Sequence, residues 1–403
     1  MANLVLYRKY RPQTFAEFIG QEHIVKTLTN AISSEMISHA YLFAGPKGSG
    51  KTTIARIFAK AVNCQTRKKG EGEEDKSSSP PFAKARDFEP CNKCSSCLEI
   101  MEGRSMDLIE IDAASHRGID DIRELKEGIR FMPTKSKYKV FILDEAHQLS
   151  KDAANALLKT LEEPPSHAIF ILATTEIHKM IPTIISRCQR FDFRRLTLPE
   201  IMKKLERIAE KEKVKVTETP SHLPPRPLQG GGSVIEKAAL ELIALNSEGS
   251  FRDAESLLDQ VFTLYGDKEI KAEDIKDLLG LVETELVGKF TDFLAQKNPS
   301  GAINFLNEIV EKGTDLEKFA KTLINYLRKA LILKIMGIDG NPIISGLTTE
   351  ELQKLNEQAK NFKEEELKKI LNLFSDAENK MKYSSIPQLP LELAIIETTE
   401  PKE

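Results

Sequence analysis

The sequence has 403 residues, of which 40% are hydrophobic and 30% are charged, and its formal net charge at pH 7 is −3. This composition is typical of a globular chain, and the length predicts two to four domains at roughly 150 residues each. No apolar run approaches the ~18 residues of a membrane helix, and the N-terminal apolar stretch is too short for a signal peptide. We therefore expect a cytosolic protein whose overall charge does not by itself predict a nucleic-acid partner.

Two short helices are predicted ahead of the first buried strand. Thr14 and Glu17 form a capping-box pattern that opens the first helix, and Gly20 ends it. Apolar residues at helical spacing over 24–31 predict the second helix. The pattern leaves open whether these helices are surface cover or the wall of a pocket for an adenine base.

Residues 45–52 read Gly-Pro-Lys-Gly-Ser-Gly-Lys-Thr and fit the P-loop pattern at every fixed position. An apolar run over 41–44 predicts a buried strand before the loop, and residues 53–62 predict a helix after it. Backbone N–H groups and the helix N-terminus would together bind an anion. Lys51 would contact the β- and γ-phosphates and Thr52 would hold Mg²⁺. The full set expected to bind the nucleotide here is Gly45, Pro46, Lys47, Gly48, Ser49, Gly50, Lys51, Thr52 and Thr53.

Four of the five cysteines lie close together in the sequence after this helix. Cys64 is followed by a polar segment over 65–90, typical of weakly ordered chain, and then by Cys91, Cys94 and Cys97. A reducing compartment disfavours disulfides, so the cluster predicts a metal rather than free thiols. Four thiolates suit a closed, structural zinc site, although the spacing also occurs in iron–sulfur proteins.

An acidic pair, Asp144 and Glu145, follows the buried strand predicted over residues 140–143. Residues 108–112 predict a strand, residues 118–130 an amphipathic helix, and residues 140–143 a buried strand that runs into Asp144 and Glu145. A parallel strand that delivers an acid beside a P-loop is the Walker B pattern. Asp144 would belong to the Mg²⁺ shell and Glu145 would polarise the attacking water.

The alternation of strands and helices continues to about residue 195. Ser150 caps a helix that ends at Pro164, and a buried strand over 169–173 delivers Thr175 to the same edge. Arg187 is either a surface cation or a finger that reaches a neighbouring subunit's γ-phosphate. The pattern predicts a mostly parallel sheet with helices on both faces and the nucleotide at the strands' carboxyl ends.

The remainder of the chain is predicted to be helical. Residues 199–213 and 234–245 predict helices around a Pro- and Gly-rich loop, and Ser250 caps another helix. Arg252 lies in its first turn, where a cation is unfavourable, so either a phosphate partner or an exposed side chain is expected. From residue 284 an all-α domain is predicted, with a packing or oligomerisation role and helices over 285–296, 300–312, 315–336, 348–360, 363–382 and 388–397.

Taken together, these motifs resemble the bacterial DNA polymerase III γ/τ family, the AAA+ ATPases of the replicative sliding-clamp loader. The resemblance covers about residues 1–280; beyond 283 it concerns only helix content and position. The matching segments are 7–15, 20–23, 39–45, the four cysteines, 107–115, 144–147, 155–165, 172–175, 186–188 and 249–254.

The resemblance implies an α/β AAA+ domain over 1–198 with a zinc module over 64–97, a helical lid over 199–282 and an all-helical collar over 283–403. It implies that Thr175 is sensor 1, that Arg187 acts in trans as an arginine finger and that Arg252 is the sensor 2 arginine. It also favours zinc over an iron–sulfur cluster. The residues that it places around the adenine are Tyr10, Arg11, Pro12, Ile19 and Gly20.

The implied function is ATP-driven opening of the sliding clamp and its loading onto primed DNA, with ATP, Mg²⁺ and structural zinc as cofactors. Implied partners are other clamp-loader subunits in a ring or arc, the clamp, primer–template DNA and the polymerase III core, in the cytoplasm near the nucleoid. The alternatives are a non-hydrolysing structural subunit, in which loss of Lys51 or Glu145 is expected, and another AAA+ remodelling motor, which needs no cysteine module.

This sequence departs from the family pattern in two segments, and it leaves the DNA-contacting residues and the tail contacts undetermined. The segments over 65–90 and 219–233 are long for the family. Arg117 and the 118–130 helix are guesses for DNA contact. The sequence stops at residue 403, before the long tail of τ-type members, so contacts made by that tail with polymerase and helicase are left open.

Overall fold

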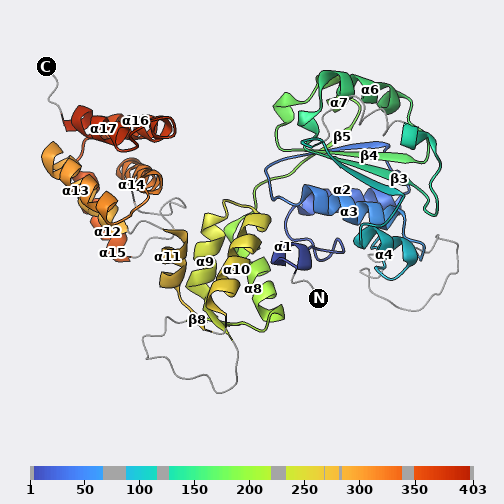
Figure 1. The fold of residues 1–403 in the computed structure, drawn as a ribbon, viewed down its shortest axis with the longest axis horizontal. Coiled ribbons are helices and arrows are strands. Elements are labelled where there is room, and N and C mark those ends of the chain that lie inside the picture. The colour runs from blue at the N-terminus through green and yellow to red at the C-terminus, as the bar shows by residue number, and fades with distance from the viewer. Residues whose placement is uncertain are drawn as a thin grey trace. The chain divides into compact units, whose positions relative to one another are not determined.

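The computed structural model describes residues 4–66, 88–115, 127–218, 233–266, 268–280, 284–337 and 349–399. Two compact units make up the chain, one over Met1–Ala272 and one over Glu273–Glu403, and each is described here by itself (Figure 1). The predicted fold class is confirmed, whereas the boundaries at 198 and 282 stay predictions. The predicted 118–130 helix lies mostly outside the described residues, as do Arg117 and most of the two long insertions.

A five-stranded parallel sheet forms the centre of the first unit, in the order β2-β3-β4-β1-β5. The strands are β1 (Ala40–Ala44), β2 (Leu108–Asp112), β3 (Lys139–Asp144), β4 (Ala168–Thr174) and β5 (Gln189–Asp192). Helices and 3-10 turns around it are α1 (Leu6–Lys9), α2 (Glu22–Ser33), α3 (Lys51–Val62), α4 (Ser95–Met101), η2 (Ala146–Gln148), α6 (Lys151–Glu162), η3 (Ile177–Lys179) and α7 (Pro182–Ile185).

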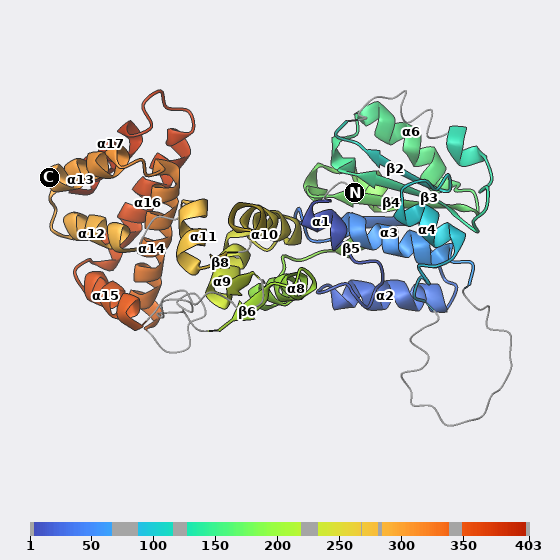
Figure 2. The same ribbon diagram turned by 60° about the horizontal axis from the view of Figure 1, so that its bottom comes forward.

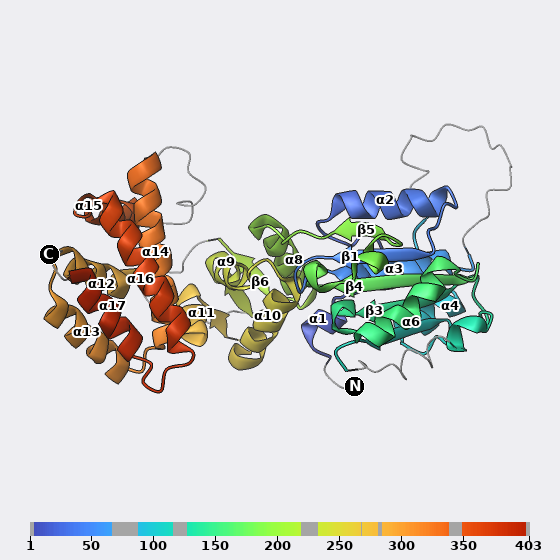
Figure 3. The ribbon, with the colours of Figure 1, turned by 90° about the horizontal axis from the view of Figure 1, so that it is seen from above.

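The central strands β1, β3 and β4 are apolar on both faces because helices cover both sides of the sheet. Tyr41 and Phe43 of β1 point into the core under α2 and α3, whereas Leu42 points into the core under α6 and α7. Figures 1 and 2 show α6 and the pair α2 and α3 on opposite sides of the strands, and Figure 3 views the sheet from the α6 side. A side chain at the carboxyl end of any central strand therefore reaches the same edge of the sheet.

Three helices and a second, small parallel sheet complete the first unit. The helices are α8 (Leu198–Lys211), α9 (Lys237–Asn246) and α10 (Phe251–Tyr265), and the strands β6 (Lys215–Thr217), β7 (Val234–Glu236) and β8 (Glu269–Ile270) pair in that order. Ser250 caps α10 as predicted, because its side chain accepts a hydrogen bond from the backbone N–H of Asp253. The packing of α8 against α9 and α10 makes this part a small helical body.

Two local predictions were wrong, and one strand was not predicted. Thr14 accepts from the backbone N–H of Glu17 at 3.3 Å, but residues 15–17 form a turn and not a helix. Residues 234–236 form β7 rather than the start of a helix. Strand β5 was not predicted, because only its Phe191 is buried and an edge strand with one covered residue has no apolar run.

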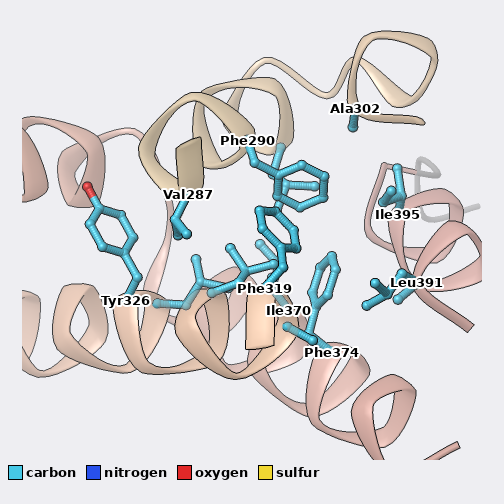
Figure 4. Packing of buried hydrophobic residues seen from close by; sticks show 14 of the residues in the cluster. Val287, Phe290, Ala302, Phe319, Tyr326, Ile370, Phe374, Leu391 and Ile395 are labelled. Atoms are coloured by element: carbon cyan, nitrogen blue, oxygen red, sulfur yellow. The ribbon is translucent and has the colours of Figure 1, made fainter. Parts of the chain in front are cut away.

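Every helix or strand in the described residues of the second unit is an α-helix, as predicted. After α11 (Ala272–Leu279) its helices are α12 (Thr284–Ala295), α13 (Pro299–Glu311), α14 (Leu316–Met336), α15 (Thr349–Lys360), α16 (Glu364–Met381) and α17 (Leu389–Thr399). Three phenylalanines from three helices meet in its core (Figure 4). The ring of Phe290 packs edge-on against Phe319 at 5.2 Å and against Phe374 at 6.0 Å between centroids.

The side-chain amide of Gln358 is buried in this apolar core. Gln358 of α15 accepts from the Tyr326 hydroxyl at 2.6 Å and donates to the Gly288 carbonyl at 2.9 Å and to the Asp292 carboxylate at 2.6 Å. These bonds satisfy the amide and join α12, α14 and α15. Within the described residues of the whole chain, no helix combines the length and the apolar character needed to cross a membrane.

Candidate nucleotide site and four-cysteine cluster

The predicted P-loop connects β1 to α3 at the edge of the sheet where the parallel strands end. Gly48 and Gly50 have φ of +74° and +97°, conformations that side chains rarely adopt. A Cβ on Gly48 would lie 1.8 Å from the Ser250 hydroxyl, and one on Gly50 would lie 2.5 Å from the Phe18 ring. Both glycines are therefore required by backbone conformation and by close neighbours at once.

Lys51 and Thr52, at the start of α3, are held by contacts within the site. The Lys51 ammonium donates to the carbonyls of Gly45 at 2.7 Å and Pro46 at 2.9 Å. Burial lowers the pKa of Lys51, which Glu145 and Asp144 partly counteract. The Thr52 hydroxyl donates to the Asp144 carboxylate at 2.8 Å. The predicted Mg²⁺-binding pair is thus within direct hydrogen-bonding contact, although the two residues are 92 positions apart.

The second acidic residue is held by the neighbouring strand. Glu145 follows β3 with φ of +48°, a strained position for a residue with a side chain. Its carboxylate accepts from the Thr175 hydroxyl at 2.8 Å, and Nδ1 of His147 lies 3.4 Å from the same oxygen. His147 Nδ1 also lies 3.0 Å from the Thr174 hydroxyl. The structure thus brings Glu145 and Thr175 together and adds His147, which the sequence interpretation did not single out.

A cavity of about 260 Å³ opens beside the loop and Asp144. Three of the five residues predicted around a base, Arg11, Pro12 and Ile19, line it, whereas Tyr10 and Gly20 do not. The Tyr10 hydroxyl instead donates to Glu212 at 2.8 Å. Other lining residues are Tyr7, Arg8, Glu17, Phe18, Lys47, Gly48, Gly50, Lys51, Thr52, Thr53, Glu145, Lys204, Phe251, Arg252 and Glu255.

Arg252 faces the cavity from the first turn of α10. Its guanidinium lies 5.1 Å from the centroid of the Tyr7 ring, which also lines the cavity. The backbone N–H of the preceding residue, Phe251, donates to the Gly48 carbonyl at 3.2 Å. The N-terminus of α10 therefore lies against the P-loop, and Arg252 is placed where an anion in the loop could reach it.

A buried ion pair lines part of the cavity. The Lys204 ammonium lies 3.4 Å from the Glu255 carboxylate and donates to the Tyr10 carbonyl at 2.7 Å. Burial raises the pKa of Glu255 to about 7 against the attraction of Lys204 and Arg11, and burial also lowers the pKa of Lys204. Sequence patterns could not find this pair, because its members lie on the inward faces of two helices 51 residues apart.

Arg187 lies away from the cavity of its own chain. It follows α7, where its guanidinium donates to the Thr183 carbonyl at 2.8 Å and forms an ion pair with Glu162 at the end of α6. The geometry does not support contact between Arg187 and the phosphates of a nucleotide bound in the cavity of the same chain. A role at a neighbouring subunit's site stays a prediction.

The four cysteines of the predicted metal site meet in space. The sulfur atoms of Cys64, Cys91, Cys94 and Cys97 all lie within 4.8 Å of one another. Burial acts to raise the pKa of Cys91, but hydrogen bonds from the Thr66 hydroxyl and nearby backbone N–H groups outweigh it and lower the pKa to about 6. Burial raises the pKa of Cys97, so cation binding would release a proton. Four converging thiols fit a tetrahedral zinc ion.

The fold and the site define a class of protein. A parallel sheet with a P-loop after β1, an acidic pair after β3 and a helical body over the loop are the features of an AAA+ P-loop NTPase.

Comparisons with known proteins narrow that class. The family model for the DNA polymerase III delta subunit matches residues 20–197, and the model for the DNA polymerase III clamp loader subunit ATPase lid domain matches 228–267. The model for DNA polymerase III subunits gamma and tau domain III matches 270–402.

Curated relatives match nearly the whole chain. The DNA polymerase III subunit tau of Bacillus subtilis is 41% identical over 98% of this chain and 63% of its own length. The DNA polymerase III subunit gamma of Buchnera aphidicola from Acyrthosiphon pisum is 32% identical over 97% of both chains. The chain belongs to the DNA polymerase III gamma/tau family of clamp-loader subunits. It spans 46% of the tau subunit of Escherichia coli, so it covers only part of such longer relatives.

Solved structures show more distant similarity. RuvB of Thermotoga maritima, a Holliday junction branch migration motor, is 20% identical with a TM-score of 0.44, covering 71% of this chain and 79% of its own. The DNA clamp loader delta protein of Bacillus subtilis is 15% identical with a TM-score of 0.36, covering 93% of this chain and 99% of its own.

Proposed function

We propose that this chain is the ATP-hydrolysing subunit of a clamp loader, which uses ATP to open a sliding clamp and place it on primed DNA. The observation that supports it most is the pair of contacts at the strand ends. Thr52 bonds Asp144 at 2.8 Å and Thr175 bonds Glu145 at 2.8 Å. A chain that only binds nucleotide needs the loop, whereas hydrolysis also needs an acid fixed beside it.

ATP would enter the cavity with its phosphates in the P-loop. Phosphate oxygens would replace the carbonyls that now accept from Lys51, and Arg252 would approach the phosphates from α10. Asp144 and Thr52 would hold Mg²⁺, which would offset the negative charge of the phosphates. Arg11, Pro12 and Ile19 would border the base. Each of these groups acts by positioning and by charge, which is how phosphoryl transfer is mainly catalysed.

Glu145 would orient the water that attacks the γ-phosphate. In the present structure its carboxylate accepts from Thr175 and lies next to His147. A bond from Thr175 keeps Glu145 turned toward β4, so release of this bond is a means of switching hydrolysis on. We infer that partner binding and DNA contact favour release of the Thr175–Glu145 hydrogen bond. This agrees with a loader that hydrolyses ATP only after the clamp is in place.

Arg187 would complete the site of a neighbouring subunit. Its place at the end of α7, outside its own cavity, suits an arginine supplied in trans to the next phosphate. ATP binding would then order several subunits into an arc that holds the open clamp around primer–template DNA. The polymerase III core and other loader subunits are the expected partners. A purely structural arm is less well supported because Lys51, Asp144 and Glu145 are all in place.

The test is ATP hydrolysis by the wild-type chain and by Glu145→Gln, with and without partner subunits, clamp and primed DNA. The wild type should hydrolyse slowly alone and faster in the full mixture. Glu145→Gln should bind ATP normally and lose hydrolysis by about 10²–10⁴-fold, the usual contribution of a general base. Equal hydrolysis by the variant and the wild type would reject the assignment of Glu145, and indifference of the wild type to clamp and DNA would reject the loader function.

A further inference from the structure

The four-cysteine cluster lies next to residues 11–19, a segment that forms part of the wall of the nucleotide cavity. Glu89, two residues before Cys91, accepts from the backbone N–H groups of Phe15 and Ala16, both at 2.9 Å. The Phe88 ring packs edge-on against the Phe15 ring at 6.4 Å. The loop that carries the cysteines therefore fixes residues 15 and 16 by two backbone hydrogen bonds and one ring contact, although the two segments are more than 70 residues apart.

A buried lysine of the P-loop helix joins the same two segments. The Lys60 ammonium donates to the Gln13 carbonyl at 2.7 Å, to the Gln13 side-chain oxygen at 2.8 Å and to the Asn92 side-chain oxygen at 2.8 Å. Lys60 is only 2% exposed, so these three acceptors satisfy its whole donor capacity. Asn92 lies between two of the cysteines in a left-handed conformation with φ of +53°. Its position depends on how Cys91 and Cys94 are held.

The fixed segment continues directly into the cavity wall. Gln13 donates from its side chain to the Arg11 carbonyl at 3.0 Å and from its backbone N–H to the Glu17 carboxylate at 2.7 Å. Arg11 and Glu17 line the cavity, as does Phe18, which lies against Gly50 of the P-loop. An unbroken set of hydrogen bonds thus runs from the cysteine loop, through Lys60 and Gln13, to the residues that would border the nucleotide.

We propose that the four-cysteine module is an anchor for the nucleotide-binding wall, with Glu89 and Lys60 as positioning residues, so that metal occupancy sets the affinity for ATP. The proposal rests on the proposed function of the cavity as an ATP site. Metal binding by thiolates contributes directly to the folding of the segment that carries them. When the cysteine-bearing segment is not held by metal, residues 11–19 must become ordered as ATP binds. The observed affinity for ATP is then the intrinsic affinity multiplied by the fraction of chains in which residues 11–19 are already ordered.

A purely local role for the metal predicts something different. A structural ion that only folds its own loop would change thermal stability and leave the wall over residues 11–19 unaffected. The two readings are separated by measuring the wall directly, without relying on enzyme activity.

The first experiment is amide hydrogen exchange on the full chain, with zinc bound and after removal of zinc by a chelator. Exchange over residues 11–19 should become faster on zinc removal and slow again when zinc is restored, whereas exchange in β4 should stay the same. Unchanged exchange over 11–19 in protein shown by elemental analysis to be zinc-free would overturn the proposal.

The second experiment measures binding of a fluorescently labelled ATP to Glu89→Gln and to a matched control, Glu99→Gln. Glu89→Gln replaces one accepting oxygen by an amide nitrogen, which cannot accept from Phe15 or Ala16. Glu99 lies in the same module but pairs with exposed Lys135 at 2.9 Å, away from the wall. We expect about tenfold weaker binding for Glu89→Gln, as for a wall ordered in one chain of ten, with zinc content and control unchanged.

Each outcome bears on a different claim. Wild-type affinity in a zinc-loaded Glu89→Gln would overturn the anchor and leave the ATP site intact. Failure of the wild type itself to bind labelled ATP would overturn the proposed function, and the anchor with it. Should Glu89→Gln unfold or lose zinc, the exchange experiment on the wild-type chain decides alone.

Discussion

The nucleotide cavity of the first unit and the aromatic core of the second unit use buried residues in opposite ways. Around the cavity the chain buries Lys51, Lys204 and Glu255, and it leaves Glu145 in a strained backbone conformation. The second unit buries phenylalanines and satisfies the one side-chain amide of Gln358 by hydrogen bonds. Buried charges cost stability unless they are paired, so these three around the cavity mark one place where this chain gives up stability for chemistry.

The largest effect is expected at Arg187, which lies outside both the nucleotide cavity and the aromatic core of its own chain. Arg187→Ala should leave ATP affinity nearly unchanged and lower hydrolysis in the assembled complex by about 10³–10⁵-fold, the usual contribution of an arginine finger. Arg190→Ala, which removes an exposed arginine paired with Asp192, is the matched control. An effect confined to the isolated subunit would argue against action in trans.

A core substitution in the second unit should affect stability and spare nucleotide binding. Phe290→Ala removes the ring that contacts Phe319 and Phe374 and should lower the free energy of unfolding of that unit by about 3–5 kcal/mol. Denaturant unfolding measures this loss, and ATP titration of the folded variant should match the wild type. Leu393→Ala, at a side chain that is 50% exposed, should change little. A marked loss of ATP affinity in folded Phe290→Ala would show that the two regions are not independent.

The smallest effect is a dependence on pH that only the cavity should show. The folded-state pKa of Glu255 is about 7, above its ordinary 4.5, because burial outweighs Lys204 and Arg11. The folded state then holds the proton more tightly, so this stabilisation is complete below pH 4.5 and is lost as pH rises through 7. Across that window wild-type stability should fall by up to about 1.4 kcal/mol per pH unit relative to Glu255→Gln.

Denaturant titrations at pH 5, 6 and 7 measure this slope, with Glu210→Gln, an exposed carboxylate on the same helix as Lys204, as control. Identical slopes for wild type and Glu255→Gln would mean that Glu255 is ionised in the folded state throughout.

The elements that the sequence predicted well are those whose signals are local. The P-loop glycines, the Ser150 and Ser250 caps and the helices of the second unit each depend on residues within a few positions. Edge strand β5 was missed because only Phe191 is covered, and β6 to β8 were missed because they are two or three residues long. Short strands are stabilised by pairing, which a sequence does not display.

Residues of the candidate site that belong to a sequence motif could be predicted. Residues that meet only because separate elements pack together were missed. Asp144 and Glu145 could be assigned because a strand delivers them beside the P-loop. Lys204 and Glu255, and Glu89 with residues 15 and 16, meet only through the packing of separate elements. Tyr10 was predicted to border the base, but its hydroxyl donates a hydrogen bond to Glu212. Because Glu212 lies 202 positions away in the sequence, no local pattern indicates this contact.

Equilibrium binding of ATP to the wild type, to Lys51→Ala and to Lys26→Ala tests the central claim most directly. The wild type and Lys26→Ala, which alters an exposed lysine of α2, should bind one ATP per chain with equal affinity. Lys51→Ala should bind at least about 100-fold more weakly, because it loses charge-assisted bonds of about 1.5–3 kcal/mol each. Equal ATP affinity in Lys51→Ala and the wild type would contradict the account.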